Sequence, residues 1–127
     1  MGSQFFMAGM LRTLLETPES EIALRWHDLE TWLQITFGKT LSIEGMLFMI
    51  GLQESHTPPK RRLEKEQKQE LIVIGSYHVL AALGLYKPND EHLDEWQATQ
   101  SIPKFSLPDQ EKLIKLGLLT YFDRARQ

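Results

Sequence analysis

Four histidines are the residues of this chain whose chemistry first suggests a metal or an acid–base site: His27, His56, His78 and His92. Carboxylate-bridged metal sites in helical bundles use paired Glu-x-x-His motifs, and none of these histidines has a glutamate three positions before it. Reversed pairs occur at His27/Glu30 and His92/Glu95, each on one face of an expected helix. A lone pair supplies two ligands, fewer than the three protein ligands of a catalytic zinc. We therefore interpret both pairs as solvated i,i+3 contacts, and we expect no metal and no cofactor.

His78 stands apart because it lies inside Leu71–Tyr86, the most apolar stretch of the chain. A buried imidazole must hydrogen-bond, either to a backbone carbonyl or to a neighbouring carboxylate. Two interpretations stay open: His78 is a satisfied core histidine, which is the commoner case, or it lines a pocket. The other polar groups expected beside the core, and so the candidates for such a pocket, are Glu54, His56 and Tyr77. No spacing motif joins them, so we identify no catalytic residue, and the sequence favours a non-enzyme without deciding the question.

One basic cluster could attract nucleic acid; it comprises Lys60, Arg61, Arg62, Lys65 and Lys68. Glutamates are interleaved with these residues, whereas phosphate binding needs an unbroken basic face. The whole chain has a net charge of −3, which gives no long-range attraction for nucleic acid or anionic lipid. We expect the cluster to be the solvated start of a helix, and we expect no nucleic-acid partner.

Composition places the chain among ordinary globular proteins, with 42% hydrophobic and 24% charged residues in 127 positions. That length fits one domain spanning residues 1–127. Cysteine is absent, which excludes disulfides, thiolate nucleophiles and cysteine-ligated zinc. No stretch reaches the roughly 20 apolar residues of a membrane span, and no basic segment precedes an apolar one as in a signal peptide. We therefore expect a soluble cytoplasmic protein without membrane contact.

Apolar residues recur at helical spacing along most of the chain, and no alternating run between turn signals predicts a strand. We predict an all-α bundle of four to six helices with no sheet. The expected helices cover residues 5–16, 18–37, 43–54, 63–84, 90–96 and 106–122. Expected helix caps are Thr17 before Pro18, Gly38 after the second helix, Ser42, and Ser106 with Asp109. Glycines inside the apolar helices, Gly45, Gly51 and Gly75, predict close approach of neighbouring helices.

The helix expected over 18–37 carries two apolar faces. Ile22, Trp26, Leu29, Leu33 and Phe37 form the stripe that should face the core. On a helical wheel that starts at Ile22, the side chains of Leu24, Ile35 and Trp32 all fall on the far side from that stripe. Either the first helix folds back over this second face, or the face is the interface of a two-fold dimer with Trp32 as its anchor.

Three segments resemble a small family of uncharacterised helical bacterial proteins: GMLFMIGLQE at Gly45–Glu54, LGLYK at Leu83–Lys87, and Leu107–Phe122. The resemblance implies a helical fold and a bacterial source, but no activity and no catalytic residue. Three function classes follow from the sequence. We favour a non-catalytic binding or homo-oligomerising protein, whose partner is a second copy or a protein that the sequence does not identify. The alternatives are a ligand binder or enzyme with a pocket near His78 and Tyr77, and a nucleic-acid accessory factor, which the acidic balance disfavours.

Overall fold

The computed structural model describes residues 2–55, 62–92 and 95–126. Its elements, in chain order, are α1 (Gly2–Leu15), α2 (Glu19–Phe37), α3 (Ile43–Glu54), α4 (Lys65–Ala82), β1 (Tyr86–Pro88), β2 (Trp96–Ala98) and α5 (Leu107–Ala125). The prediction of a mainly helical fold is confirmed, and the prediction of no sheet is wrong. Within the described ranges, no helix is both long and apolar enough to cross a membrane.

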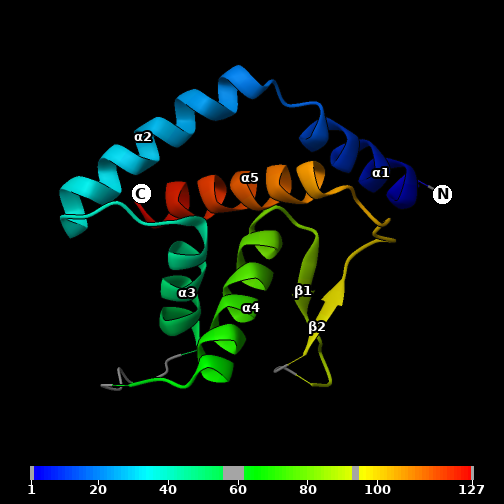
Figure 1. Cartoon of the computed structure of the whole chain (residues 1–127). Coiled ribbons are helices and arrows are strands. Elements are labelled where there is room, and N and C mark those ends of the chain that lie inside the picture. The colour runs from blue at the N-terminus through cyan, green and yellow to red at the C-terminus, as the bar shows by residue number, and fades with distance from the viewer. Residues whose placement is uncertain (1, 56–61, 93–94, 127) are drawn as a thin grey trace.

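Helix α5 runs through the middle of the molecule, with α1 and α2 on one side and α3, α4 and the two strands on the other (Figure 1). Because neighbours cover it on both sides, α5 is buried around much of its circumference. Its buried apolar side chains are Leu113, Leu116, Leu118, Leu119 and Phe122, none more than 5% exposed. All of them except Leu113 join Leu29 and Leu33 of α2 and Met46 and Ile50 of α3 in the main core, whereas Leu113 packs with Leu11 and Leu85 in a second cluster.

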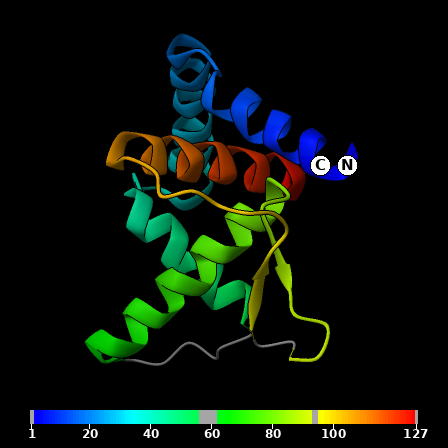
Figure 2. The same ribbon diagram turned by 90° about the vertical axis from the view of Figure 1, so that its right-hand side faces the viewer.

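Backbone contact joins α3 to α4, which cross each other in Figure 2. A Cβ atom added to Gly51 would lie 2.0 Å from the carbonyl oxygen of Leu71, and one added to Gly75 would lie 2.0 Å from that of Leu47. The predicted close approach is therefore confirmed at both glycines. At Gly45 it is wrong, because the nearest atom there is the Ser42 hydroxyl oxygen at the start of the same helix.

The helix ends follow the expected caps in most places. Gly38 is left-handed with φ 75°, and the Ser42 and Ser106 hydroxyl oxygens accept backbone N–H groups at 3.0 and 3.3 Å. The predicted Thr17 cap is wrong. The Thr17 hydroxyl instead donates to the Thr13 carbonyl at 3.3 Å, and α2 begins one residue later than expected, after an extended Pro18.

The predicted helix over 90–96 is also wrong, because the described residues of this range lie between β1 and β2 of a β-hairpin or, in the case of Trp96, begin β2. Strand β1 pairs antiparallel with β2, and Pro88 lies opposite Trp96. The Asn89 side-chain oxygen accepts the backbone N–H groups of Glu91 and His92, at 2.9 and 3.3 Å. Such local side-chain bonds compete with helix formation and favour a turn.

Aromatic packing holds this hairpin against α4. The Trp96 ring stacks on the Tyr77 ring with centroids 5.5 Å apart and planes inclined by 4°. The Tyr86 ring meets Tyr77 edge-on at 5.2 Å. These tertiary contacts stabilise strands too short to be recognised from alternation.

Candidate functional site

Polar side chains from three helices meet where α3 ends beside the second half of α4 and the last turns of α5. The Tyr121 hydroxyl donates to one carboxylate oxygen of Glu54 at 2.5 Å. The other carboxylate oxygen lies 3.9 Å from Nδ1 of His78. Glu54 is the last residue of α3, and its carboxylate contacts α5 at Tyr121 and lies near α4 at His78.

Burial controls the protonation of this cluster. The pKa of His78 is lowered because desolvation disfavours the imidazolium, an effect larger than the opposing attraction of the Glu54 carboxylate. The pKa of Tyr121 is raised by burial, by its hydrogen bond to Glu54 and by the charge of that carboxylate. At neutral pH the imidazole of His78 is therefore neutral and the phenol of Tyr121 is protonated. The edge of the His78 ring also meets Trp96, with centroids 4.7 Å apart.

Glu54, His78 and Tyr121 line an open groove of about 460 Å³. The other residues that line it are Gln53, Arg124 and the small residues Ala81, Ala82 and Ala125. Arg124 makes no ion pair with another described residue and stands exposed. The groove thus offers a carboxylate, an imidazole and a guanidinium, which can orient a polar ligand. A separation of 3.9 Å between His78 and Glu54 is longer than a hydrogen bond, so the carboxylate does not hold the imidazole as in a catalytic pair.

Of the four predicted pocket residues, the structure brings together Glu54 and His78. Tyr77 faces the hairpin instead, where it packs on Tyr86 and Trp96. His56 lies outside the described residues. Tyr121 and Arg124 were not among the predicted pocket residues, because Tyr121 continues an apolar helical stripe and lies 67 positions from Glu54.

The other polar motifs remain on the surface. His27 is exposed and lies with Glu30 along a shallow hollow on α2. His92 and Glu95 share no helical face, contrary to the prediction, since they belong to the hairpin turn. Arg62, Lys65 and Lys68 of the basic cluster are exposed, while Lys60 and Arg61 lie outside the described residues. In the described ranges, no group of three histidine or acidic side chains is placed to hold a metal ion.

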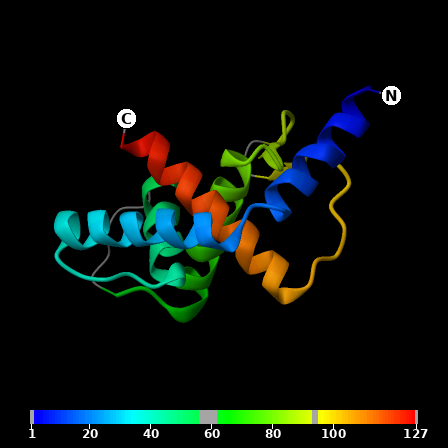
Figure 3. The same cartoon turned by 90° about the horizontal axis from the view of Figure 1, so that it is seen from above.

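The outer face of α2 presents two of the three predicted interface residues. Leu24 is 71% exposed and Ile35 is 78% exposed. Helix α1 does not cover them, because from the connection between the two helices α1 and α2 extend in different directions (Figure 3). Trp32 differs from the prediction: it packs on Phe122 of α5 at 6.1 Å, and the Arg126 guanidinium lies 5.2 Å from its ring centre.

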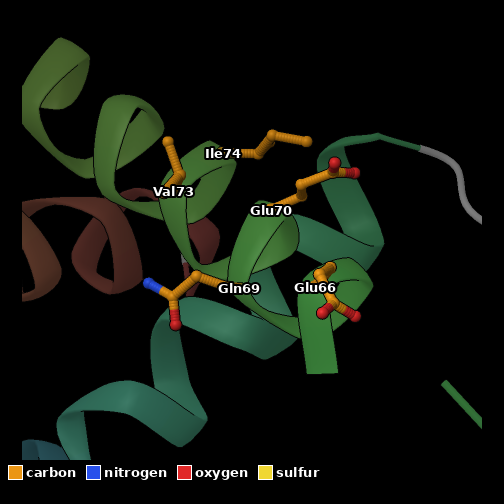
Figure 4. Close-up of a pocket in the computed structure, with 5 residues that line it drawn as sticks. All are labelled: Glu66, Gln69, Glu70, Val73 and Ile74. Carbon is orange, nitrogen blue, oxygen red and sulfur yellow. The ribbon is translucent and has the colours of Figure 1, made fainter. Parts of the chain in front are cut away.

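A further hollow of about 510 Å³ lies along the first half of α4. Its lining residues are Glu66, Gln69, Glu70, Val73 and Ile74 (Figure 4). All five come from one helix, and their side chains point in different directions rather than toward a common centre. The hollow is therefore a surface stripe and not a cleft between elements.

Comparisons with protein families, with curated proteins and with solved structures find no match to this chain. The resemblance to bacterial helical proteins consequently stays a prediction. A function has to be inferred from the polar groove and from the outer face of α2.

Proposed function

We propose that this chain is a non-catalytic helical binding protein that self-associates through the outer face of α2. The observation that carries the proposal is the exposure of Leu24 and Ile35, at 71% and 78%, on one side of the same helix. The two residues are about three helical turns apart and fall within about 20° of each other on the wheel. Exposed large apolar side chains that share a face favour burial against a partner.

A two-fold antiparallel pair of α2 helices suits this spacing. In that arrangement Leu24 of each copy lies level with Ile35 of the other, so the two apolar contacts are repeated by symmetry. Asp28 and Thr31 lie between them on the same face, and the same register brings Asp28 of one copy level with Thr31 of the other. The Thr31 hydroxyl can then donate to the Asp28 carboxylate at the centre of the interface.

Charge complementarity favours the antiparallel direction. In this register Glu21, in the first turn of α2, lies beside Lys39 of the other copy. Lys39 follows the last turn of α2 in the sequence. Both side chains are exposed, and neither forms an ion pair within the described chain. The helix dipoles also oppose each other in an antiparallel pair, so each positive N-terminus lies near a negative C-terminus.

The surface beside Ile35 has room for the other copy. A shallow hollow of about 320 Å³ lies there, bordered by His27, Thr31 and Gln34 of α2 and by Thr40. Leu24 of the second copy would enter this hollow in the antiparallel register. Trp32 takes no part, because its ring already packs on Phe122 inside one chain.

Light scattering on the eluting peak tests the proposal. We expect a dimer mass at tens of micromolar and a monomer mass for Leu24→Glu and Ile35→Glu. Leu107→Glu is the matched control, since Leu107 is also 78% exposed but lies on α5. A monomer mass for the unmodified chain, or dissociation by Leu107→Glu to the same extent, would refute the α2 interface.

Exchanging the charges of Glu21 and Lys39 tests the antiparallel register independently of the apolar contacts. Glu21→Lys should weaken the dimer at least about fivefold at low salt, because two symmetry-related pairs of about 0.5 kcal/mol each are lost. Glu21→Lys combined with Lys39→Glu should restore the affinity. A combined variant as weak as the single one would rule out the antiparallel register and leave the apolar face in place.

A further inference from the structure

An apolar pocket of about 200 Å³ lies between α4, β1, the segment 99–106 and α5. We call it the Leu85 pocket after the buried residue that forms its floor with Leu113; they are 1% and 3% exposed. Tyr86, Ile102, Phe105 and Ile114 form its walls. Helix α2 contributes none of the lining residues, so the pocket is independent of the proposed self-association.

Hydrogen bonds and ring packing fix the walls. The Gln110 side-chain amide donates to the Phe105 carbonyl at 3.0 Å and ties the segment 99–106 to the first turn of α5. At the other end of that segment, the Thr99 hydroxyl donates to the Gly84 carbonyl at 2.6 Å. The Tyr86 ring is held by Tyr77. The pocket is therefore preformed, which lowers the entropic cost of binding.

The residues that line the pocket determine which kind of ligand it can bind. Among the described residues, no charged side chain lines the pocket, and the polar side chains there are those of Gln110 and Tyr86. Water needs two to four polar partners to occupy such a space favourably. An apolar cavity of about 150 Å³ lined by Leu, Ile and Phe stays dry and binds benzene. A volume of about 200 Å³ accommodates one ring with a small substituent, or a chain of equal bulk.

We propose that the Leu85 pocket binds a small apolar molecule of this size. The segment 99–106 supplies Ile102 and Phe105 to the lining, α4 supplies Leu80, and α5 supplies Gln110, Leu113 and Ile114. Burial of the ligand's apolar surface provides the binding free energy.

A toluene titration of the full chain, followed by methyl NMR, tests the proposal. We expect saturable shifts of the methyl resonances of Leu85, Ile102, Leu113 and Ile114. The unfolding temperature should rise with toluene concentration, because a ligand of the native state stabilises it. Absence of saturation up to the solubility of toluene, or saturable shifts confined to other methyl groups, would overturn the proposal.

Variants that fill the pocket supply the second test. Ile114→Phe and Ile102→Phe enlarge lining residues from two different segments, and each should weaken toluene binding at least tenfold with the helical spectrum retained. Val73→Phe is the control, because it enlarges an exposed side chain on the outer stripe of α4. If Ile114→Phe does not fold, Ile102→Phe decides, since it lies outside the helices. Unchanged affinity in the folded filling variants would show that toluene binds elsewhere.

Discussion

The junction of α3, α4 and α5 and the outer face of α2 both carry apolar side chains at helical spacing, but these side chains are covered to opposite extents. At the junction, backbones touch: a Cβ added to Gly117 would lie 2.7 Å from the Val79 carbonyl oxygen, closer than real Cβ atoms approach. On the outer face of α2, Leu24 and Ile35 stand in solvent. Helical periodicity therefore identifies an apolar face, whereas glycine inside that face indicates that a neighbouring backbone covers it.

The largest effect we predict is at the junction. Gly75→Ala should lower the free energy of unfolding by about 3 kcal/mol or more, because its Cβ would overlap the Leu47 carbonyl and force α3 away from α4. Chemical denaturation measures the change.

Gly9→Ala is the matched control for this substitution. Gly9 also lies inside a helix, α1, but a Cβ there meets nothing within 4 Å. The helix propensity of alanine should therefore stabilise this variant by about 0.5–1 kcal/mol. If Gly75→Ala and Gly9→Ala lowered the free energy of unfolding equally, the contact between α3 and α4 could not be the cause of the loss at Gly75.

Local signals predicted much of the fold. Gly38, Ser42 and Ser106 end or begin helices as expected, since a cap depends on residues within one turn. Gly51 and Gly75 indicated their contacts because glycine is costly in a helix without a packing reason. These features can be read from a few neighbouring residues.

The sequence did not predict the features that depend on contacts between residues far apart in the chain. The hairpin at Tyr86–Ala98 depends on Tyr77 of α4, which no local pattern indicates. Phe37 was expected to face the core but is 47% exposed, because it ends α2 beyond the end of α5 (Figure 1). The polar groove depends on contacts between the ends of three helices, so Glu54 and His78 were identified without Tyr121 and Arg124.

We expect an effect of intermediate size when the charge of Glu54, which lies at the junction of α3, α4 and α5, is removed. Because the carboxylate partly offsets the desolvation of His78, Glu54→Gln should lower the pKa of His78 further. An NMR titration of the imidazole protons measures this change.

The sign of the pH dependence follows from the same groups. The folded-state pKa of His78 lies below the ordinary 6.5, so below that pH the unfolded chain binds more protons than the folded one. The stability due to neutral His78 is fully present above pH 6.5 and is lost as the pH falls toward the folded-state pKa. An upward shift of the His78 pKa in Glu54→Gln would contradict the role given to the carboxylate.

The smallest effect is expected on the outer face of α2, from Leu24→Ala in the monomer. Leu24 is 71% exposed, so its truncation removes little buried surface, and the high helix propensity of alanine offsets that loss. The free energy of unfolding should change by no more than about 0.5 kcal/mol. Ile22→Ala, two residues earlier, should cost about 2–4 kcal/mol because Ile22 is 3% exposed and packs in the core. Both are measured by urea denaturation at a protein concentration where light scattering gives the monomer mass, so that dissociation does not contribute. If Leu24→Ala lost as much stability as Ile22→Ala under those conditions, Leu24 would have to contact the rest of its own chain, and the outer face could not then receive a second copy.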